Sequence, residues 1–282
     1  MSLDTMLHAP RPLARASTVN RRTADSTEFG HPERIDILGL PFARLTQPGL
    51  LDQIERMIQD GGTHWIVTAN VQHVSMAARD AAFRGTLCSA DLVAADGAPI
   101  CWLSGHGARE PLERVTGADL VRPLARRCRD RGWRLLLMGG DKGVAQEVGQ
   151  RLETENPGLV LCDAFSPQFA DGRIDGPETD DAIARIHEAR PDVLLLALGT
   201  PKQELWISHC LERLDVPVSI GVGAAFDFLA GRQRRAPVWV QKAGCEWVHR
   251  VVLEPRRLGP RYLRNGVTFI RLAARELLRR DV

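Results

Sequence analysis

Short apolar runs alternate with stretches of helical periodicity from residue 35 to residue 222, and this alternation limits the fold more than any other feature of the chain. Brief runs of valine, leucine and isoleucine, each followed by a helical stretch, are typical of buried strands that helices connect. The expected strands are 35–40, 65–68, 92–95, 134–138, 159–162, 193–198 and 218–222. The expected helices are 50–58, 71–84, 97–103, 117–131, 143–154, 178–189 and 202–213. The sequence therefore predicts an α/β fold with a mainly parallel, helix-covered sheet.

The two ends of the chain differ from this alternating middle part. Residues 1–32 are rich in proline, serine, threonine and arginine with little apolar periodicity, which predicts a disordered arm. After Gly231 the strands give way to helical, arginine-rich segments. We therefore expect an arm of residues 1–32, a sheet domain of residues 33–231 and a basic helical appendage of residues 232–282. No apolar run approaches bilayer-spanning length and the first 30 residues lack a signal-peptide core, so a cytosolic protein is expected.

Charge is distributed unevenly although the net charge is only +2. Residues 232–282 hold 13 Lys and Arg against 4 Asp and Glu, whereas residues 1–231 hold 24 against 31. A basic end suggests an anionic partner, either lipid or nucleic acid, and a solvated arginine-rich helix is the alternative. Within 261–280 apolar residues share one helical face beside a row of arginines, which is typical of a helix lying in a membrane interface. The apolar residues of that face are Leu263, Val267, Ile270, Leu277 and Leu278.

Metal and disulfide chemistry find no support in the sequence. Six cysteines are scattered without a Cys-x-x-Cys pair, which indicates reduced thiols. The chain contains no Asp-x-Asp triplet, no His-Glu-x-x-His motif and no Gly-x-Ser-x-Gly motif. No metal site is therefore predicted, and a bound phosphate would be held by arginines and helix N-termini.

Small and polar residues follow five of the expected strands. Ligands of parallel α/β sheets bind at the carboxyl ends of the strands, so these residues are predicted to converge on one cleft. They are Thr68 and Asn70; Asp96 and Gly97; Gly139 and Gly140; Gly199, Lys202, Gln203 and Glu204; and Gly223 and Asp227.

Several of these residues have a purely structural alternative. The pair Gly139-Gly140 serves a tight turn as readily as a phosphate site, and Asp96 is also a suitable helix N-cap. Residues 221–226 approach a dinucleotide fingerprint, but Phe226 stands where the last small residue is required and no helix clearly follows. A nicotinamide-dependent oxidoreductase is therefore one rival function, and a non-catalytic nucleotide-sugar-binding protein with a nucleic-acid-binding tail is another. The tail lacks interleaved aromatic residues and a helix-turn-helix pattern, which argues against nucleic acid.

A series of motifs in one order carries a resemblance to a known family. They are Thr68-Ala-Asn70, residues 90–99 around Asp96-Gly97, residues 114–120 from Arg114, residues 137–140, residues 197–204, residues 221–227, residues 231–237, Glu246-Trp247, Arg250, residues 254–257 and residues 261–263. With this set, the chain resembles the WecG/TagA/CpsF glycosyltransferases, also called glycosyltransferase family 26, over roughly residues 36–265. Ala95 stands where the family often has proline and Cys245 where it usually has leucine. Neither change removes a functional group.

The resemblance implies an inverting, metal-independent enzyme with a Rossmann-like core and no cofactor. The donor would be a UDP-sugar carrying N-acetylmannosamine, its uronic acid or a hexose. The acceptor would be a saccharide on polyprenyl pyrophosphate, used in cell-surface polysaccharide biosynthesis. Such an enzyme would be a peripheral protein on the inner face of the cytoplasmic membrane, with the anionic surface as a partner and no nucleic acid. A homo-oligomer stays open.

The resemblance also implies roles for individual residues. Asp96 would be the base, ionised because its pKa is expected near the ordinary value of about 3.9. Arg114 would neutralise the departing UDP with its planar guanidinium. Thr68, Asn70 and Gln203 would hold sugar or pyrophosphate oxygens, and Asp227 uracil or ribose. Substrate-binding roles are also expected for Gly139, Gly140, Gly199, Lys202, Glu204, Gly223, Arg235, Arg256, Arg257 and Arg261.

Overall fold

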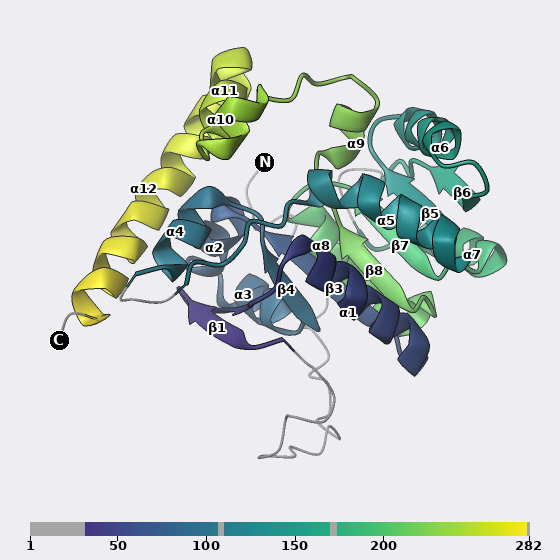
Figure 1. Ribbon diagram of the computed structural model, residues 1–282, viewed down its shortest axis with the longest axis horizontal. Coiled ribbons are helices and arrows are strands. Elements are labelled where there is room, and N and C mark those ends of the chain that lie inside the picture. Colours follow the sequence, from purple (N-terminus) through teal and green to yellow (C-terminus); the bar gives the residue numbers. More distant parts are fainter. Residues whose placement is uncertain (1–31, 107–109, 170–173, 281–282) are drawn as a thin grey trace.

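An eight-stranded sheet forms the centre of the computed structural model, which describes residues 32–106, 110–169 and 174–280 (Figure 1). The strand order is β1-β2-β4-β3-β8-β7-β5-β6, and every neighbouring pair is parallel except β1 and β2. The strands are β1 (Arg34–Ile37), β2 (Leu40–Ala43), β3 (His64–Ala69), β4 (Leu92–Ala95), β5 (Arg134–Gly139), β6 (Val160–Phe165), β7 (Val193–Ala197) and β8 (Val218–Gly221). The predicted α/β fold is confirmed. The disordered arm expected for residues 1–32 falls almost wholly outside the described residues.

Helices cover both faces of the sheet and divide the core into two apolar layers. One layer packs under α1 (Gln47–Asp60), α5 (Gly117–Arg131), α6 (Val144–Glu155) and α9 (Ala225–Leu229). The other packs under α2 (Val71–Ala77), α3 (Ala81–Cys88), α4 (Ala98–Ser104), α7 (Pro177–Ala189) and α8 (Lys202–Leu214). Successive strand residues point to opposite layers: Leu135 and Leu137 lie in the first, Leu136 and Met138 in the second. The inner strands β3, β4, β5, β7 and β8 are buried on both faces, which explains their continuous apolar sequence, whereas the edge strands β1 and β6 are partly exposed.

Two expected elements are wrong because local turn chemistry interrupts them. The single strand predicted over 35–40 is a hairpin, since Leu38 and Gly39 adopt positive φ values of 55° and 82° and turn β1 back onto β2. The single helix predicted over 71–84 is two helices. The Asp80 carboxylate accepts hydrogen bonds from the backbone N–H groups of Ala82 and Phe83, so it caps a new helix. A short helix, α9, does follow the glycine segment 221–223, contrary to expectation.

Three helices follow the last strand: α10 (Val238–Lys242), α11 (Glu246–Leu253) and α12 (Pro255–Arg280). Figure 1 shows α12 as a long helix along one side of the domain, with α10 and α11 near its N-terminal end. Its inner face rests on α2, where Ser75 Oγ donates to the Asn265 carbonyl at 2.8 Å and Arg79 Nη2 donates to Asn265 Oδ1 at 2.8 Å. None of the helices in the described ranges combines the length and apolarity needed to cross a bilayer.

The outer face of α12 is apolar and exposed. Leu263 and Leu278 are each 70% exposed and Ile270 is 67% exposed. Leu277, expected on this same face, instead packs against the core. The helix is therefore two-sided: one apolar face is buried on the domain and another faces outward.

Gly139 ends β5 in a place that admits no side chain. Its φ is 121°, and a Cβ there would lie 2.7 Å from the carbonyl group of Ala197 on the neighbouring strand. Gly140 continues the turn with φ 71° and donates its N–H to the Ala197 oxygen at 2.9 Å. These contacts give both glycines a structural role at the end of the sheet.

Gly139→Ala should therefore lower the free energy of unfolding by about 2–4 kcal/mol, through backbone strain and overpacking together. Gly61→Ala is the matched control, because Gly61 also has positive φ (73°) but has nothing within 4 Å of its Cβ position. The control should lose about 1–2 kcal/mol from strain alone. Urea denaturation measures both losses, and equal losses would contradict the packing argument.

Candidate functional site

A cavity of about 440 Å³ opens where β3, β4 and β8 end; we call it the strand-end cavity. The three strands are neighbours in the sheet, because β3 pairs with β4 on one side and with β8 on the other. The C-terminal helices α11 and α12 form the opposite wall. Nine of the residues predicted for the cleft or the site line it: Thr68, Asn70, Asp96, Gly97, Arg114, Gln203, Gly223, Arg235 and Arg261.

The other predicted residues lie elsewhere among the described positions. Gly139 and Gly140 turn the chain at the end of β5, which β7 and β8 separate from β3 in the sheet. Glu204 is buried behind the cavity wall. Lys202 Nζ lies 5.8 Å from the centre of the Phe169 ring. Asp227 follows β8 on α9 and accepts a hydrogen bond from Gln233 Nε2 at 3.4 Å. Gly199, at a left-handed turn with φ 76°, also lies outside the cavity lining. Arg256 is exposed on the first turn of α12 and does not line the cavity either. Arg257 follows it on the backbone of α12.

Strand pairing places the polar groups on the sheet side of the cavity. Thr68 Oγ1 donates to the carbonyl of Gly221 at 2.9 Å, which ties the end of β3 to the end of β8. The backbone N–H of Asp96 donates to the carbonyl of Ala69 at 2.8 Å, so Asp96 directly follows the β3–β4 pair. Asn70 caps α2, with its Oδ1 accepting from Gln72 N at 2.9 Å. The groups therefore meet at one edge of the sheet.

Asp96 has an environment that differs from the expected one. Burial, together with the nearby Glu246 carboxylate, raises the pKa of Asp96 to about 7. The Gly117 N–H, 3.4 Å from Asp96 Oδ2, and the Arg114 guanidinium act in the opposite direction but do not restore the ordinary value. The expectation of an ordinary pKa near 3.9 is therefore wrong. A carboxyl group with a pKa near 7 can take up and release a proton at neutral pH.

Two arginines that line the cavity belong to a charged network with Asp119 and Glu246. Arg235 Nη2 donates to Asp119 Oδ2 at 2.8 Å, and Arg235 Nε donates to Glu246 Oε1 at 3.2 Å. Its hydrogen bond to Asp119 raises the pKa of Arg235, so this guanidinium is a fixed cation. Arg114 has a looser contact, with Nη1 3.7 Å from Glu246 Oε2. Arg114 therefore keeps more donors for an anionic ligand than Arg235 does.

Sequence reasoning missed two features of the site. One is His73, which is 1% exposed and joins Asn70 to the buried Glu204. The spacing Asn70-x-x-His73 matches that of a capping box and was a usable signal. The other is an aromatic part of the cavity, lined by Trp102, Trp247 and Tyr262, in which the last two rings stack at 6.3 Å. Nothing in a local pattern brings 102 and 262 together.

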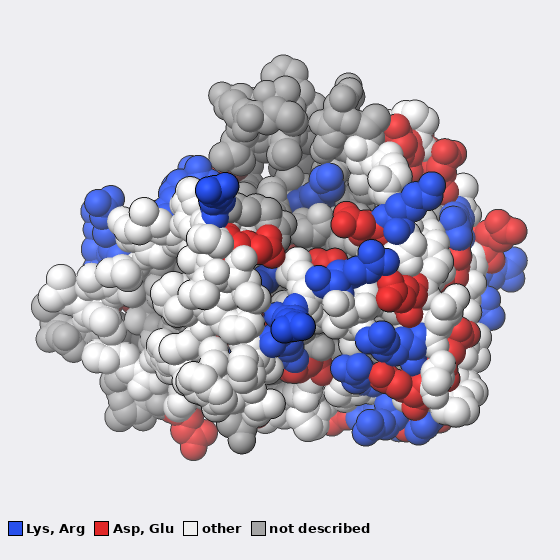
Figure 2. All heavy atoms as spheres, turned by 90° about the horizontal axis from the view of Figure 1, so that it is seen from above, with Lys and Arg blue, Asp and Glu red and all other residues white. Residues whose placement is uncertain are grey.

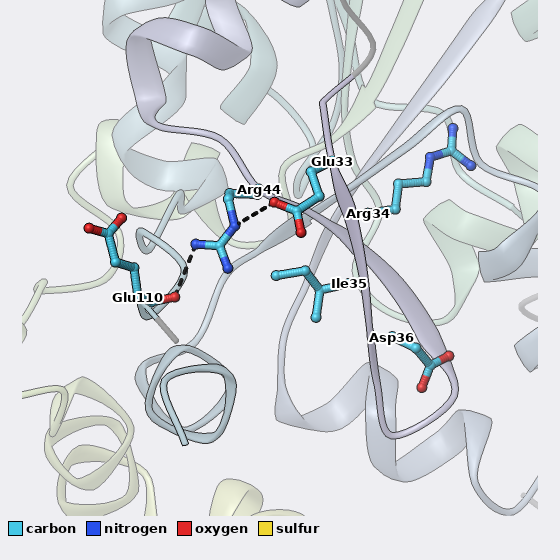
Figure 3. A pocket seen from close by; sticks show the side chains of 6 residues that line it. All are labelled: Glu33, Arg34, Ile35, Asp36, Arg44 and Glu110. Atoms are coloured by element: carbon cyan, nitrogen blue, oxygen red, sulfur yellow. Dashed lines mark hydrogen bonds and ion pairs between the residues drawn. The ribbon is translucent and has the colours of Figure 1, made fainter. Parts of the chain in front are cut away.

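A second hollow of about 530 Å³ lies beside the edge strand β1 (Figure 3). Its Arg44 is already engaged, with Nε donating to Glu33 at 3.0 Å and Nη1 donating to the Glu110 carbonyl at 3.0 Å. It is open and gathers none of the predicted site residues. The strand-end cavity is therefore the candidate functional site.

Comparison with known proteins gives a family and several relatives. A family model described as "Glycosyl transferase WecG/TagA/CpsF family" matches residues 35–282. A protein of Staphylococcus aureus (strain MRSA252) is 27% identical over 235 residues, which cover 82% of this chain and 89% of that protein. It is named N-acetylglucosaminyldiphosphoundecaprenol N-acetyl-beta-D-mannosaminyltransferase. The protein of the same name from strain NCTC 8325 / PS 47 has the same identity and coverage.

The raised pKa of Asp96 makes a prediction about stability. Folding disfavours ionisation of this carboxyl group, so the wild-type protein should lose stability as the pH rises from about 4 to about 7. Asp96→Asn removes the ionisation and should be more stable than wild type above pH 7, by at most about 4 kcal/mol. The difference should fade below about pH 4, where both side chains are neutral. Urea denaturation across this pH range measures it, and a variant less stable at pH 8 would contradict the raised pKa.

Proposed function

Because the chain belongs to the WecG/TagA/CpsF family of glycosyltransferases, we propose that it transfers a sugar from a UDP-sugar to a saccharide carried on polyprenyl pyrophosphate. The names of the Staphylococcus aureus relatives support N-acetylmannosamine as the sugar and an N-acetylglucosaminyl-diphosphoundecaprenol as the acceptor. The uronic acid and a hexose stay as alternatives for the sugar. The product would serve cell-surface polysaccharide biosynthesis.

The observation that carries this proposal is a carboxyl group of raised pKa that shares one cavity with two arginines, one of them held in place by ion pairs. In the proposed step the acceptor hydroxyl oxygen attacks the anomeric carbon of the donor sugar, and its proton passes to the Asp96 carboxylate. The bond between the anomeric carbon and the UDP oxygen breaks, and its electron pair leaves with UDP. Attack opposite the leaving group inverts the anomeric configuration.

Arg114 and Arg235 suit the departing diphosphate in different ways. Arg235 is held in place by Asp119 and Glu246, so it provides fixed positive charge. Arg114 keeps donors free of close pairing and can form a two-pronged contact with phosphate oxygens. Thr68, Asn70 and Gly223 would lie against the sugar and pyrophosphate. Asp227 keeps its proposed role toward uracil or ribose, although it lies outside the cavity lining.

The appendage of residues 232–282 would bring the enzyme to its lipid-linked acceptor. Arg261 and the aromatic residues of α11 and α12 line the cavity from this side. Apolar side chains of the outer α12 face are exposed, and in Figure 2 the part of the surface on the α12 side is mostly uncharged, whereas acidic and basic residues interleave on the opposite part. We propose that this face lies on the anionic inner face of the cytoplasmic membrane, with Arg256 and Arg257 near the lipid pyrophosphate.

The substrate classes can be tested directly. The full-length protein is offered a panel of UDP-sugars together with short-chain polyprenyl-pyrophosphate glycosides, and the release of UDP is measured. Acceptor-dependent release from UDP-N-acetylmannosamine is expected to exceed release from the other sugars. Absence of acceptor-dependent release from every UDP-sugar would contradict the proposed donor class.

Asp96→Asn should lower turnover by about 10²–10⁴-fold, because the variant lacks the proton acceptor. Its affinity for UDP should stay close to wild type. The kcat/KM of the wild-type protein should rise with pH and level off above about 7, where the carboxyl group is ionised. Since the Asn variant is expected to be the more stable protein, unfolding would not explain its loss of activity. Turnover near the wild-type rate would rule out Asp96 as the base.

The membrane role predicts that the full-length protein sediments with anionic vesicles at low salt and is released as salt rises. Leu263→Gln with Leu278→Gln, at two positions that are each 70% exposed, should weaken sedimentation without changing the thermal midpoint by more than a few degrees. Val160→Gln on β6 is the matched control, at an exposed apolar residue on the edge strand farthest from β1, and it should sediment like wild type. Equal sedimentation of all three proteins would place the membrane contact elsewhere.

A further inference from the structure

A carboxylate and an imidazole form a buried pair directly behind the strand-end cavity. Glu204 on α8 and His73 on α2 are 2% and 1% exposed, and His73 Nε2 lies 3.0 Å from Glu204 Oε1. The imidazole stacks against the Phe83 ring, with 6.4 Å between the ring centres. Burying a charged carboxylate is costly unless hydrogen bonds compensate it. Two side chains form hydrogen bonds with Glu204 Oε1, and each begins a separate branch that leads to the cavity.

The first branch runs from Glu204 through His73 to Asn70. His73 Nδ1 lies 3.1 Å from both the backbone nitrogen and the side-chain Oδ1 of Asn70, and Nε2 also lies 3.2 Å from Thr200 Oγ1. Because the backbone N–H can only donate and Oδ1 already accepts from Gln72 N, we assign Nδ1 as the acceptor. The ring proton is then on Nε2 and is donated to Glu204 Oε1. Asn70 Oδ1 accepts from Gln72 N, which leaves the Nδ2 amide as the end that a ligand in the cavity can use. Glu204 thus fixes both the tautomer of His73 and the position of Asn70.

The second branch runs from the same carboxylate oxygen to the end of β8. Gln203 Nε2 donates to Glu204 Oε1 at 2.6 Å, and Gln203 Oε1 accepts from the backbone N–H of Gly223 at 3.1 Å. Gly221 leaves room for this side chain, since a Cβ there would lie 2.7 Å from Gln203 Nε2. Both polar ends of Gln203 are therefore engaged in holding the turn that contains Gly223.

We propose that Glu204 is a positioning residue that acts through His73 and Gln203 to hold two neighbouring parts of the donor site, Asn70 after β3 and Gly223 after β8. This inference rests on the proposed function and replaces the direct substrate contact expected for Glu204. Its second oxygen, Oε2, is buried and has no hydrogen-bond partner among the described residues. A buried carboxylate with an unsatisfied oxygen destabilises the folded state. A role in positioning Asn70 and Gly223 explains why this side chain occupies a core position.

Two isosteric or near-isosteric changes test the positioning role. Glu204→Gln removes the charge that receives both donors. His73→Gln keeps a side chain that can close the capping box at the start of α2 but removes the imidazole link to Glu204. In both variants the KM for the UDP-sugar and the dissociation constant for UDP should rise about ten-fold or more, while the KM for the acceptor stays within about two-fold. The double variant should lose no more than Glu204→Gln alone, because both changes break the same path.

Thr179→Val is the matched control for a buried hydrogen bond outside the site. Thr179 is 1% exposed, donates to the Ile174 carbonyl at 2.6 Å and receives the Trp206 indole N–H at 3.2 Å. This variant should lower the thermal midpoint without moving the KM for the UDP-sugar. A purely structural role for Glu204 and His73 would give them the same signature, and that result would overturn the proposal.

The tautomer gives a spectroscopic readout that needs no substrate. In a long-range proton–nitrogen NMR spectrum of the full-length protein labelled at histidine, His73 should show an unprotonated Nδ1 and a protonated Nε2, identified by its loss in His73→Gln. Glu204→Gln should shift the Nε2 signal more than any other histidine signal. The opposite tautomer, or nitrogen signals averaged between the two tautomers, would overturn the proposed link from Glu204 through His73 to Asn70.

The two proposals fail in distinguishable ways. A wild-type protein that transfers sugar, with variants that keep the wild-type KM for the UDP-sugar and affinity for UDP, overturns the positioning role alone. A wild-type protein that neither binds UDP nor uses any UDP-sugar overturns the proposed function. The NMR result then still decides whether Glu204 holds His73 and Asn70 as inferred.

Discussion

The site depends on the position of β3 between two parallel partners. Because β4 and β8 run parallel to β3 and pair with it directly, all three strands end at the same edge of the sheet. The chain leaves β3 through α2 toward β4, whereas β8 arrives on the other side from β7. The connections therefore diverge above β3, and the strand-end cavity lies there. Thr68, Asn70 and Asp96 enter that space simply by following their strands.

Acidic and basic side chains alternate around this space and set the pKa values of its carboxyl groups. Asp96 is driven toward its neutral form by burial and by Glu246, while Arg114 moderates that effect. Glu246 in turn pairs with Arg235, and Asp119 completes the set. Burial alone would raise the pKa of Asp119, but hydrogen bonds from Arg235 and Thr116 outweigh it and lower the pKa. The pKa values of two carboxyl groups in one region thus shift in opposite directions, because one has an arginine in direct contact and the other does not.

Sequence reasoning was most successful where function follows from local position. Of the residues selected by the rule that ligands bind at strand ends, six line the cavity: Thr68, Asn70, Asp96, Gly97, Gln203 and Gly223. Gly199, Lys202, Glu204 and Asp227 were selected by the same rule and do not line it. The same rule placed Gly139 and Gly140 in the site, yet Ala197 packs against that turn and accounts for its glycines. The pairing of His73 with Glu204, the pKa of Asp96 and the orientation of Gln203 depend on contacts between residues far apart in the chain, so no local pattern predicts them. The hairpin at Leu38-Gly39 and the break before Asp80 were missed because each is a matter of two or three residues within an apolar run.

The order of the elements along the chain has a consequence for how the protein is made. The eight strands end at Gly221, and the helices that complete the cavity wall, α11 and α12, come only afterwards. Since chains are synthesised from the N-terminus and domains fold as units, the sheet can fold on the ribosome while the cavity is still open on one side. In that interval the face of α2 that later receives Asn265 is uncovered. A nascent chain would therefore have a folded sheet but an incomplete cavity until the appendage has left the ribosome and docked.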